Sequence, residues 1–410
     1  MEKLQRKYAE VLLKTCLKIE ECQPLFITYD IERRDFVRIV AEIAYELGVK
    51  DIYLEANDPL IKHDSLKYLN IEDLKKSSLW NKDIWNVYAK KNAAFLMLAS
   101  QTPNLMKDID EKKLNDIAMY ALKTKKDYND LRAKSKLAWC IAAVPTLDWA
   151  KEVYPDALEP LNKLWQAIFR ICSINTDNPE KEVLNKIKKN ERIAGKLNEY
   201  NFKTLHYQNK LGTDFTIELP EGHVWATGSE KLTSGKDVLV NFPSLEVFTS
   251  PKYDTAEGIV YSSKPLCYQD VLIDEFSLTF EKGKVVKVGA KKGLKTLKTL
   301  VSSCKNSDYL GEVALVPFNS EISNEKTIFY ETLYDENASC HLALGDSFPE
   351  CLKNGVKMSK EELYKKGLNH CDNHVDFMVG TKDLKITGTT YDDKEVIIFE
   401  NGNFAKEFIN

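Results

Sequence analysis

Acids and histidines concentrate in one stretch of the chain, residues 331–376. Within it, Glu336 and His341 lie in one segment, and His374 and Asp376 lie in another segment further along. Carboxylates and neutral imidazoles are ligands that divalent ions such as Zn, Mn and Mg accept from proteins. The residue types in this stretch therefore indicate a candidate metal site.

The spacing of these residues suits both a metal site and an ordinary hydrogen-bonded pair of side chains. His374 and Asp376 are two residues apart, so on a β-strand both side chains would point to the same face. Glu336 and His341 are five apart, which is too far for one strand face but easy to bridge with a turn. An H-x-D pair is also typical of two side chains that simply hydrogen-bond to each other, so both interpretations stay open.

Two acids outside this stretch stand in unusual surroundings. Glu246 lies in a short apolar segment bracketed by Pro243 and Pro251, which stiffen the backbone. Glu312 opens an otherwise apolar run that ends at Pro317. Burying a carboxylate is costly unless it is paired or bound to a metal. Both acids are therefore further candidates for the site, with an ordinary buried ion pair as the alternative.

Several familiar catalytic motifs are absent from the sequence. It contains no H-E-x-x-H zinc motif, no G-x-S-x-G nucleophile turn, no G-x-G-x-x-G after a strand and no Walker loop. The nine cysteines are scattered without a C-x-x-C pair, so we expect reduced thiols rather than a disulfide framework or a thiolate zinc site.

The composition narrows the possible partners and compartments. Lys and Arg total 58 against 62 Asp and Glu, a net charge of -4, so we expect no attraction to nucleic acid or to an anionic membrane. The first residues are charged every few positions and lack the apolar core of a secretory signal. No window approaches the length of a membrane span. We therefore expect a cytoplasmic protein.

The first half of the chain alternates short apolar runs with longer helical patterns. The helical pattern over 32–47, which ends at Gly48, is one example. Such alternation is typical of βαβ units around a parallel sheet. The predicted strands lie at residues 24–30, 51–58, 93–100 and 137–145.

The second half has a different texture, in which apolar and polar residues alternate as in antiparallel strands. Fifteen of the 17 glycines and five of the six histidines come after residue 200. We therefore predict an α/β protein with an N-terminal α/β domain over 1–199 and a strand-rich α+β catalytic domain over 200–410. Predicted strands or hairpins lie at 212–222, 237–243, 277–290 and 383–404, and predicted helices near 291–305 and 359–367.

Four segments occur in an order and spacing that resemble the aminopeptidase T and aminopeptidase S type family of dinuclear metallopeptidases. Two flanking segments are similar as well, so the resemblance covers essentially the whole chain. The four segments are NFPSLEVFTSP, LGEVALVP, DENASCHLALG and NHVDFMVG, and the two flanking ones are GTDFTIELPEGHVW and FVRIVAEIAYELGVKD.

The resemblance implies a metal centre with two divalent ions, which could be Zn, Co, Mn or Mg. Glu246 and His374 would bind the first ion. Glu336, His341 and Asp376 would bind the second. Glu312 would bridge both ions and take part in catalysis. Four carboxylates then balance the charge of two divalent ions, and the two histidines bind as neutral imidazoles.

The same resemblance implies a metal-dependent aminopeptidase that removes N-terminal residues from short peptides through a water activated by two ions. It also implies a homodimer whose active sites face an internal cavity. One position departs from the family, because Phe348 stands where the family has a tyrosine that is thought to assist catalysis.

Two alternatives to a peptidase remain. The first is a catalytically weak or inactive metal-stabilised scaffold, which Phe348 favours. The second is another two-metal hydrolase, acting on phosphate esters or small amides. The last arginine of the chain is Arg192, far from the candidate ligands, which argues against a phosphate substrate.

Overall fold

A computed structural model describes residues 1–77, 79–102, 105–268 and 271–409. The chain forms two compact units, Met1–Leu184 with Ser229–Pro243, and Asn185–Gly228 with Ser244–Asn410. Each unit therefore contains two separate stretches of sequence. The sequence-based division into domains 1–199 and 200–410 is a different description, and it stays a prediction.

A parallel sheet forms the centre of the first unit, in the strand order β10-β4-β3-β1-β2. Its strands are β1 (Leu25–Asp30), β2 (Ile52–Asn57), β3 (Ala94–Ala99), β4 (Trp139–Ala143) and β10 (Asn241–Phe242). Strands covered on both faces read as continuous apolar runs, as β3 does. The four strands predicted in the first half and their parallel arrangement are confirmed. The segment 237–243 differs, because its end (β10) joins this parallel sheet by pairing with β4.

Helices connect these strands, and their ends follow local chemistry. Asp58 accepts hydrogen bonds from the backbone of Leu60 and Ile61 and starts α3, which has Pro59 in its first turn. In the described part of the chain, no helix has the length and apolar character that crossing a membrane requires. The helices are α1 (Glu2–Glu10), which continues as a π-helix (Val11–Cys16), α2 (Arg34–Glu46), α3 (Pro59–Tyr68), α4 (Ile71–Ser77), α5 (Leu79–Lys90), α6 (Glu111–Thr124), α7 (Lys126–Ala133), α8 (Leu147–Val153) and α9 (Pro160–Ile171).

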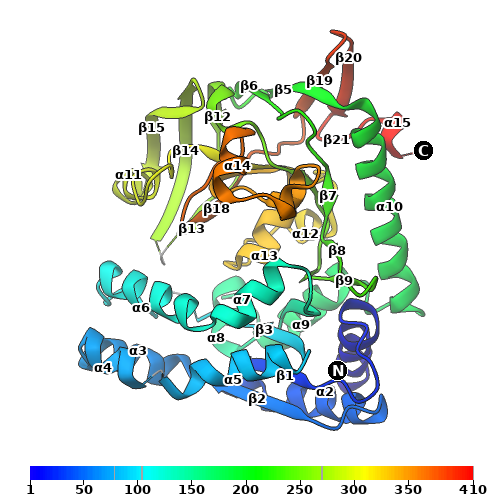
Figure 1. Ribbon diagram of the computed structural model, residues 1–410, viewed down its shortest axis with the longest axis vertical. Helices are drawn as coiled ribbons and strands as arrows, with labels where there is room; N and C mark the ends of the chain where they lie inside the picture. The colour runs from blue at the N-terminus through cyan, green and yellow to red at the C-terminus, as the bar shows by residue number, and fades with distance from the viewer. Residues whose placement is uncertain (78, 103–104, 269–270, 410) are drawn as a thin grey trace. The chain divides into compact units, whose positions relative to one another are not determined.

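A large antiparallel sheet in the second unit has the order β13-β14-β12-β6-β5-β19-β20-β21, with β15 paired to β14. The predicted hairpin near 277–290 is confirmed, because β14 and β15 are joined by a turn in which Lys282 and Gly283 have positive φ angles (Figure 1). The strands are β5 (Phe202–Gln208), β6 (Asp214–Glu218), β12 (Glu257–Tyr261), β13 (Leu266–Tyr268), β14 (Val271–Glu281), β15 (Lys284–Lys292), β19 (Lys385–Thr390), β20 (Glu395–Glu400) and β21 (Asn403–Phe404).

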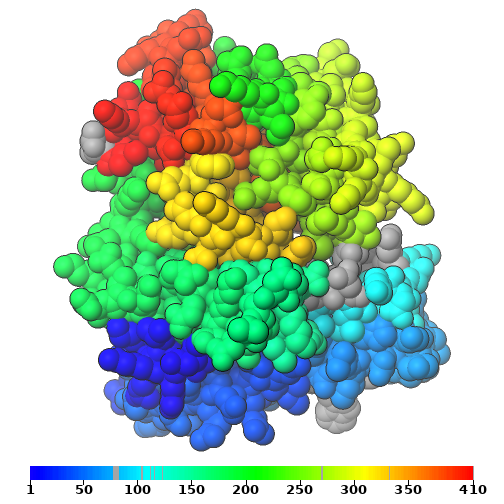
Figure 2. All heavy atoms as spheres, turned by 180° about the vertical axis from the view of Figure 1, so that it is seen from behind, coloured from blue at the N-terminus to red at the C-terminus, as the bar shows by residue number. Residues whose placement is uncertain are grey.

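Helix α11 of the second unit packs against β14 and β15 of this sheet. The long helix α10 runs beside the C-terminal α15, where the ring of Tyr200 lies 5.6 Å from that of Phe408. In Figure 2 the red C-terminal atoms lie next to the green atoms of α10. The two predicted helices are present but shorter than predicted. The helices are α10 (Pro179–Tyr200), whose residues up to Leu184 belong to the first unit, α11 (Leu294–Val301), α12 (Glu321–Asn324), α13 (Thr332–Asp335), α14 (Lys360–Lys365) and α15 (Lys406–Ile409). In the first unit, β8 (Ser229–Lys231) pairs with β9 (Asp237–Leu239).

A second antiparallel sheet of the same unit has the order β18-β17-β16-β11-β7. Every residue of its central strand β16 is buried. Here and below we call it the ligand sheet, because four of the six predicted ligands lie on its strands. The strands are β7 (Ala226–Thr227), β11 (Val247–Thr249), β16 (Leu310–Leu315), β17 (His341–Gly345) and β18 (His374–Met378).

The register of the ligand sheet places these side chains on one face. Glu312 pairs with Ala343, and Ala343 pairs with Asp376, so the three residues form one row across three strands. His341 is two residues from Ala343, and His374 is two residues from Asp376. Because residues two apart on a strand share a face, all four candidate ligands point the same way.

Gly311 lets β16 approach its neighbour closely. The β16–β17 register shifts between Leu310 and Glu312, so Gly311 is the extra residue of a β-bulge. A Cβ atom at Gly311 would lie 2.1 Å from the carbonyl oxygen of Asp346 and 2.5 Å from that of Gly345. A glycine immediately before Glu312 is thus required for that acid to reach its position.

We expect Gly311→Ala to lower the free energy of unfolding by about 1–3 kcal/mol, because the added methyl group collides with backbone rather than with a flexible side chain. Urea unfolding measures this change. The control is Gly195→Ala in α10, where a Cβ meets nothing within 4 Å. Alanine favours a helix, so this control should gain about 0.5–1 kcal/mol. Equal midpoints for Gly311→Ala and the wild type would contradict the close approach.

Candidate metal centre

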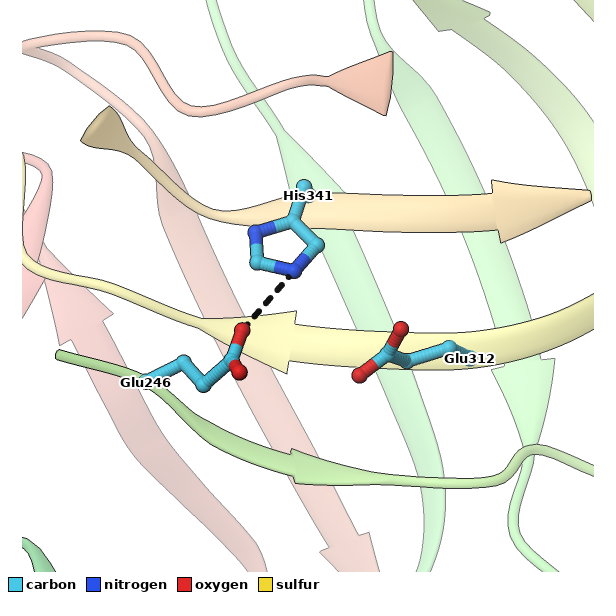
Figure 3. Close-up of side chains that lie close together, drawn as sticks. All are labelled: Glu246, Glu312 and His341. Carbon is cyan, nitrogen blue, oxygen red and sulfur yellow. Dashed lines mark ion pairs between the residues drawn. The ribbon is translucent and has the colours of Figure 1, made fainter. Parts of the chain in front are cut away.

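The ligand sheet brings five of the six predicted ligands together. Glu312 lies on β16, His341 begins β17, His374 and Asp376 lie on β18, and Glu246 directly precedes β11. Figure 3 shows three of these side chains, Glu246, Glu312 and His341, converging from neighbouring strands. Residues far apart in sequence therefore meet because the strands that carry them are adjacent.

The five residues form two groups that share one acid. The ligand atoms of Glu246, Glu312 and His341 all lie within 4.8 Å of one another, and so do those of Glu312, His374 and Asp376. His341 Nε2 is 3.1 Å from Glu246 Oε2, and His374 Nε2 is 3.1 Å from Glu312 Oε2. Glu312 is 4% exposed and belongs to both groups, which is the position that a bridging carboxylate needs.

The two histidines are grouped with different acids from those that the resemblance implies. His374 is grouped with Asp376 rather than with Glu246, and His341 with Glu246 rather than with Asp376. The strand geometry explains the first pair, because His374 and Asp376 are two residues apart on β18. It explains the second because β16 alone separates β17 from β11.

Glu336 lies outside these two groups but within electrostatic reach of them. It begins a short 3-10 helix, Glu336–Ala338, directly after α13. Burial raises the pKa of Glu336 well above its usual range, and the negative charges of Asp376, Glu246 and Glu312 raise it further. Glu336 thus adds a fourth carboxylate to the same electrostatic cluster.

Asn337 positions this turn, although its place in the sequence did not mark it as a site residue. Its side chain is fully buried. Its Oδ1 accepts a hydrogen bond of 2.8 Å from the backbone N–H of Leu245, and its Nδ2 donates one of 3.0 Å to the carbonyl of Leu333. Asn337 therefore fastens the segment before Glu246 to the segment that carries Glu336. The one available signal was an amide side chain directly after a candidate acid.

Backbone carbonyls orient both histidines. His374 Nδ1 is 2.8 Å from the carbonyl oxygen of Asp346, and His341 Nδ1 is 3.2 Å from that of Ser339. When Nδ1–H donates to a carbonyl, Nε2 keeps its lone pair for a metal. In both residues Nε2 is the atom that faces the acids.

Asp346 holds the turn that precedes β18, and it too was not predicted as a site residue. Its carboxylate accepts hydrogen bonds from the backbone N–H of Cys371, at 3.0 Å, and from Nδ1 of His370, at 2.9 Å. His370 therefore supports the turn and belongs to neither ligand group. Asp346 links this turn to His374 through its own carbonyl group.

The charges of the cluster show why it needs cations. Burial raises the pKa of Glu312 to about 7, although the hydrogen bond from His374 opposes the shift. Burial disfavours the charged form of His341, but the hydrogen bond to Glu246 and the surrounding negative charges outweigh it and raise the pKa of His341 to about 9. The imidazoles thus retain protons that balance the acids, and metal binding must displace those protons.

The donor set fits divalent ions. It combines carboxylate oxygens with two imidazole nitrogens and no thiolate, which suits Zn, Co, Mn or Mg. Asp376 Oδ1 is buried and makes no hydrogen bond within the described part of the chain, although it lies 3.2 Å from His374 Nε2. A buried carboxylate oxygen that faces the Nε2 atom of a neighbouring imidazole is placed to share an ion with it.

Phe348 lies against the cluster. Its ring centroid is 4.8 Å from that of His374 and 5.4 Å from that of Phe248. Its backbone N–H donates a hydrogen bond of 2.9 Å to Ser250 Oγ. The position at which the sequence departs from the family pattern thus contacts a candidate ligand directly.

The chain resembles known proteins over nearly its full length. The family model described as thermophilic metalloprotease (M29) matches residues 1–404. Aminopeptidase AmpS of Bacillus subtilis (strain 168) is 38% identical over 400 residues, covering 97% of each chain. Aminopeptidase 2 of Geobacillus stearothermophilus is 39% identical over 408 residues, covering 99% of this chain and 98% of the relative.

A solved structure gives the same result. Wild-type AmpT from Thermus thermophilus superposes with a TM-score of 0.90 at 29% identity, covering 98% of this chain and 99% of the other. The resemblance found in the sequence segments and the predicted α/β fold class are thereby confirmed.

If each ligand group holds one ion, we expect Glu312→Gln to weaken the binding of both by more than about 100-fold, because it removes one charge from the acid that both groups share. Metal content after dialysis, measured by plasma mass spectrometry, tests this. Glu246→Gln belongs to one group and should release one ion preferentially, and exposed Glu361→Gln should release none. Two tightly held ions in Glu312→Gln would show that Glu312 does not bridge.

Proposed function

The chain belongs to the thermophilic metalloprotease (M29) family and is a metal-dependent aminopeptidase, and we propose that it releases N-terminal residues from short peptides at a centre of two divalent ions. The observation that carries this proposal is the position of Glu312 in two groups of ligand atoms at once. One shared carboxylate between two sets of donors is the arrangement expected for a two-ion centre.

We assign the ligands by proximity. Glu246, Glu312 and His341 would hold one ion, and Glu312, His374 and Asp376 would hold the other. Glu336 would complete the centre, since the other acids act on it electrostatically. The four carboxylates, Glu246, Glu312, Glu336 and Asp376, then balance the charge of two divalent ions, which lowers the cost of burying them.

Residues of the chain orient the ligands and fix their spacing for hydrolysis. When bound, the two ions would supply a water of lowered pKa and would polarise the scissile carbonyl. The carbonyls of Asp346 and Ser339 keep His374 and His341 turned so that Nε2 faces the centre. The buried ligand sheet fixes the spacing of the acids, so little reorganisation is needed when a substrate binds.

A free α-amino group would explain why the activity is confined to the N-terminus. An unblocked amine can ligate an ion or pair with a nearby acid, and the cluster provides both kinds of partner. An acetylated N-terminus has no basic lone pair and no positive charge. The substrate would thus be anchored by the same group that distinguishes an exopeptidase substrate.

We also propose a cytoplasmic homodimer. None of the nine cysteines is in a formed disulfide, which suits a reducing compartment. In the first unit, β2 is the end strand of its sheet, and Leu54 on that strand is 45% exposed. A sheet edge with exposed apolar side chains is a surface that another chain can cover.

We expect the metal-free enzyme to be inactive and to regain activity when Zn, Co, Mn or Mg is added back. The assay uses a matched pair of short peptides that differ only in N-terminal acetylation. Because the acetylated peptide lacks the amine anchor, its kcat/KM should be lower by at least about 100-fold, or about 2.7 kcal/mol. Equal rates on the two peptides would contradict the amine anchor, and full activity without metal would contradict the metal centre.

We expect Phe348→Tyr to raise kcat with little change in KM, because the new hydroxyl group would be placed beside His374. Steady-state kinetics on the unblocked peptide measures this. Phe248→Tyr is the matched control, since it adds a hydroxyl group to the neighbouring ring, and it should not raise kcat. An unchanged or lower kcat in Phe348→Tyr would show that the site works without this hydroxyl group.

A further inference from the structure

Two cysteines of the second unit lie unusually close together. Cys304 lies between α11 and β16, Cys371 lies in the turn before β18, and their Sγ atoms are 2.6 Å apart. Non-bonded heavy atoms pack best at about 3.5–4.0 Å, whereas bonded sulfurs lie about 2.05 Å apart. The separation of these thiols is therefore nearer to a covalent bond than to ordinary contact.

Hydrogen bonds that do not involve the sulfur atoms hold the segments of Cys304 and Cys371 close together. Asn306 Nδ2 donates to the carbonyl of His370 at 3.1 Å, and Asn369 Nδ2 donates to the carbonyl of Asn306 at 2.9 Å. Asn373 Nδ2 donates to Ser303 Oγ at 2.6 Å. These three bonds join the segments 303–306 and 369–373, so the thiols are held together by their surroundings.

A metal site explains the pair less well. Two thiolates on a tetrahedral zinc ion, with Zn–S bonds of about 2.3 Å, lie about 3.8 Å apart. Such a site also needs further donors, and the ligand groups that the described residues form contain neither cysteine. The spacing of the sulfurs and the absence of these further donors both favour a bond between the sulfurs.

We propose that Cys304 and Cys371 form a reversible disulfide, which ties the segment before β16 to the turn before β18. These two strands carry Glu312 and His374. The disulfide is thus a modification site beside the metal centre rather than part of it, and its formation does not depend on the proposed chemistry of that centre.

The oxidant is a low-molecular-weight disulfide, and the exchange is balanced. The half-buried Cys304 attacks first as a thiolate, forms a mixed disulfide and displaces one small thiol. Cys371 then attacks Cys304 Sγ, displaces the second small thiolate and gives its proton to that leaving thiolate. Two protein thiols become one disulfide, and one small disulfide becomes two thiols.

The environments of the two cysteines agree with this order. Cys371 is only 5% exposed, and its backbone N–H is held by the Asp346 carboxylate. Burial and the contact with Cys304 raise the pKa of the Cys371 thiol to about 12. Cys371 is therefore shielded from a reagent in solution and reacts with the sulfur already beside it.

The full-length protein is incubated with glutathione disulfide, and its free thiols are counted and its peptides mapped by mass spectrometry. We expect residues 304 and 371 in one linked peptide with full reversal by dithiothreitol, whereas the exposed Cys22 and Cys267 can only carry glutathione singly. The oxidised form should melt a few degrees higher, because the bond constrains the unfolded chain.

Single variants separate this pair from general thiol reactivity. Cys371→Ser should accumulate glutathione on Cys304, because the second attack is missing, while Cys304→Ser should leave Cys371 unmodified. Exposed Cys267→Ser is the matched control and should form the same linked peptide as the wild type.

Two results would overturn the proposal. If the wild type keeps all its thiols, or forms no linked 304–371 peptide, the two cysteines are not a disulfide pair. If the linked peptide forms but the melting temperature does not rise, the bond does not brace the two segments.

Discussion

The arrangement of the second unit depends on repulsion among buried carboxylates, which protons or cations must offset. Three of the acids, Glu246, Glu312 and Asp376, lie within a few ångströms of two imidazoles on one sheet, and the charge of Glu336 acts on the same cluster. Without cations, the pKa of Glu312 rises to about 7 and that of His341 to about 9. Positive charge must balance these buried carboxylates, and either protons or divalent ions can provide it.

Much of the fold could be predicted from the sequence, because local patterns determine it. The apolar runs that became β1, β3 and β4 reflect strands covered on both faces, and the Lys282–Gly283 turn has the positive φ angles of a tight hairpin. The parallel pairing of β10, which lies within the strand predicted at 237–243, could not be assigned in this way. This strand contains two residues, and its pairing with β4 brings together segments about a hundred positions apart.

The types of the site residues could be predicted, but their grouping could not. An acid that opens an apolar run and a histidine two residues before an acid are visible in one dimension. Which histidine meets which acid depends on the order β18-β17-β16-β11 and on the bulge at Gly311, and both are tertiary. Asn337 and Asp346 act through bonds to backbone atoms, which leave no pattern in the spacing of residues.

Ala343 is the smallest residue of the row Glu312–Ala343–Asp376, and its size affects the space between the two acids. Ala343 stands between Glu312 and Asp376 on neighbouring strands, so one methyl group is all that fills the middle of the row. The two acids start about 10 Å apart at the backbone and reach toward each other over it. The space between the two acids is therefore set by the side chain of Ala343, which is not a ligand. A bulkier side chain at this buried position would occupy the space between the two acids.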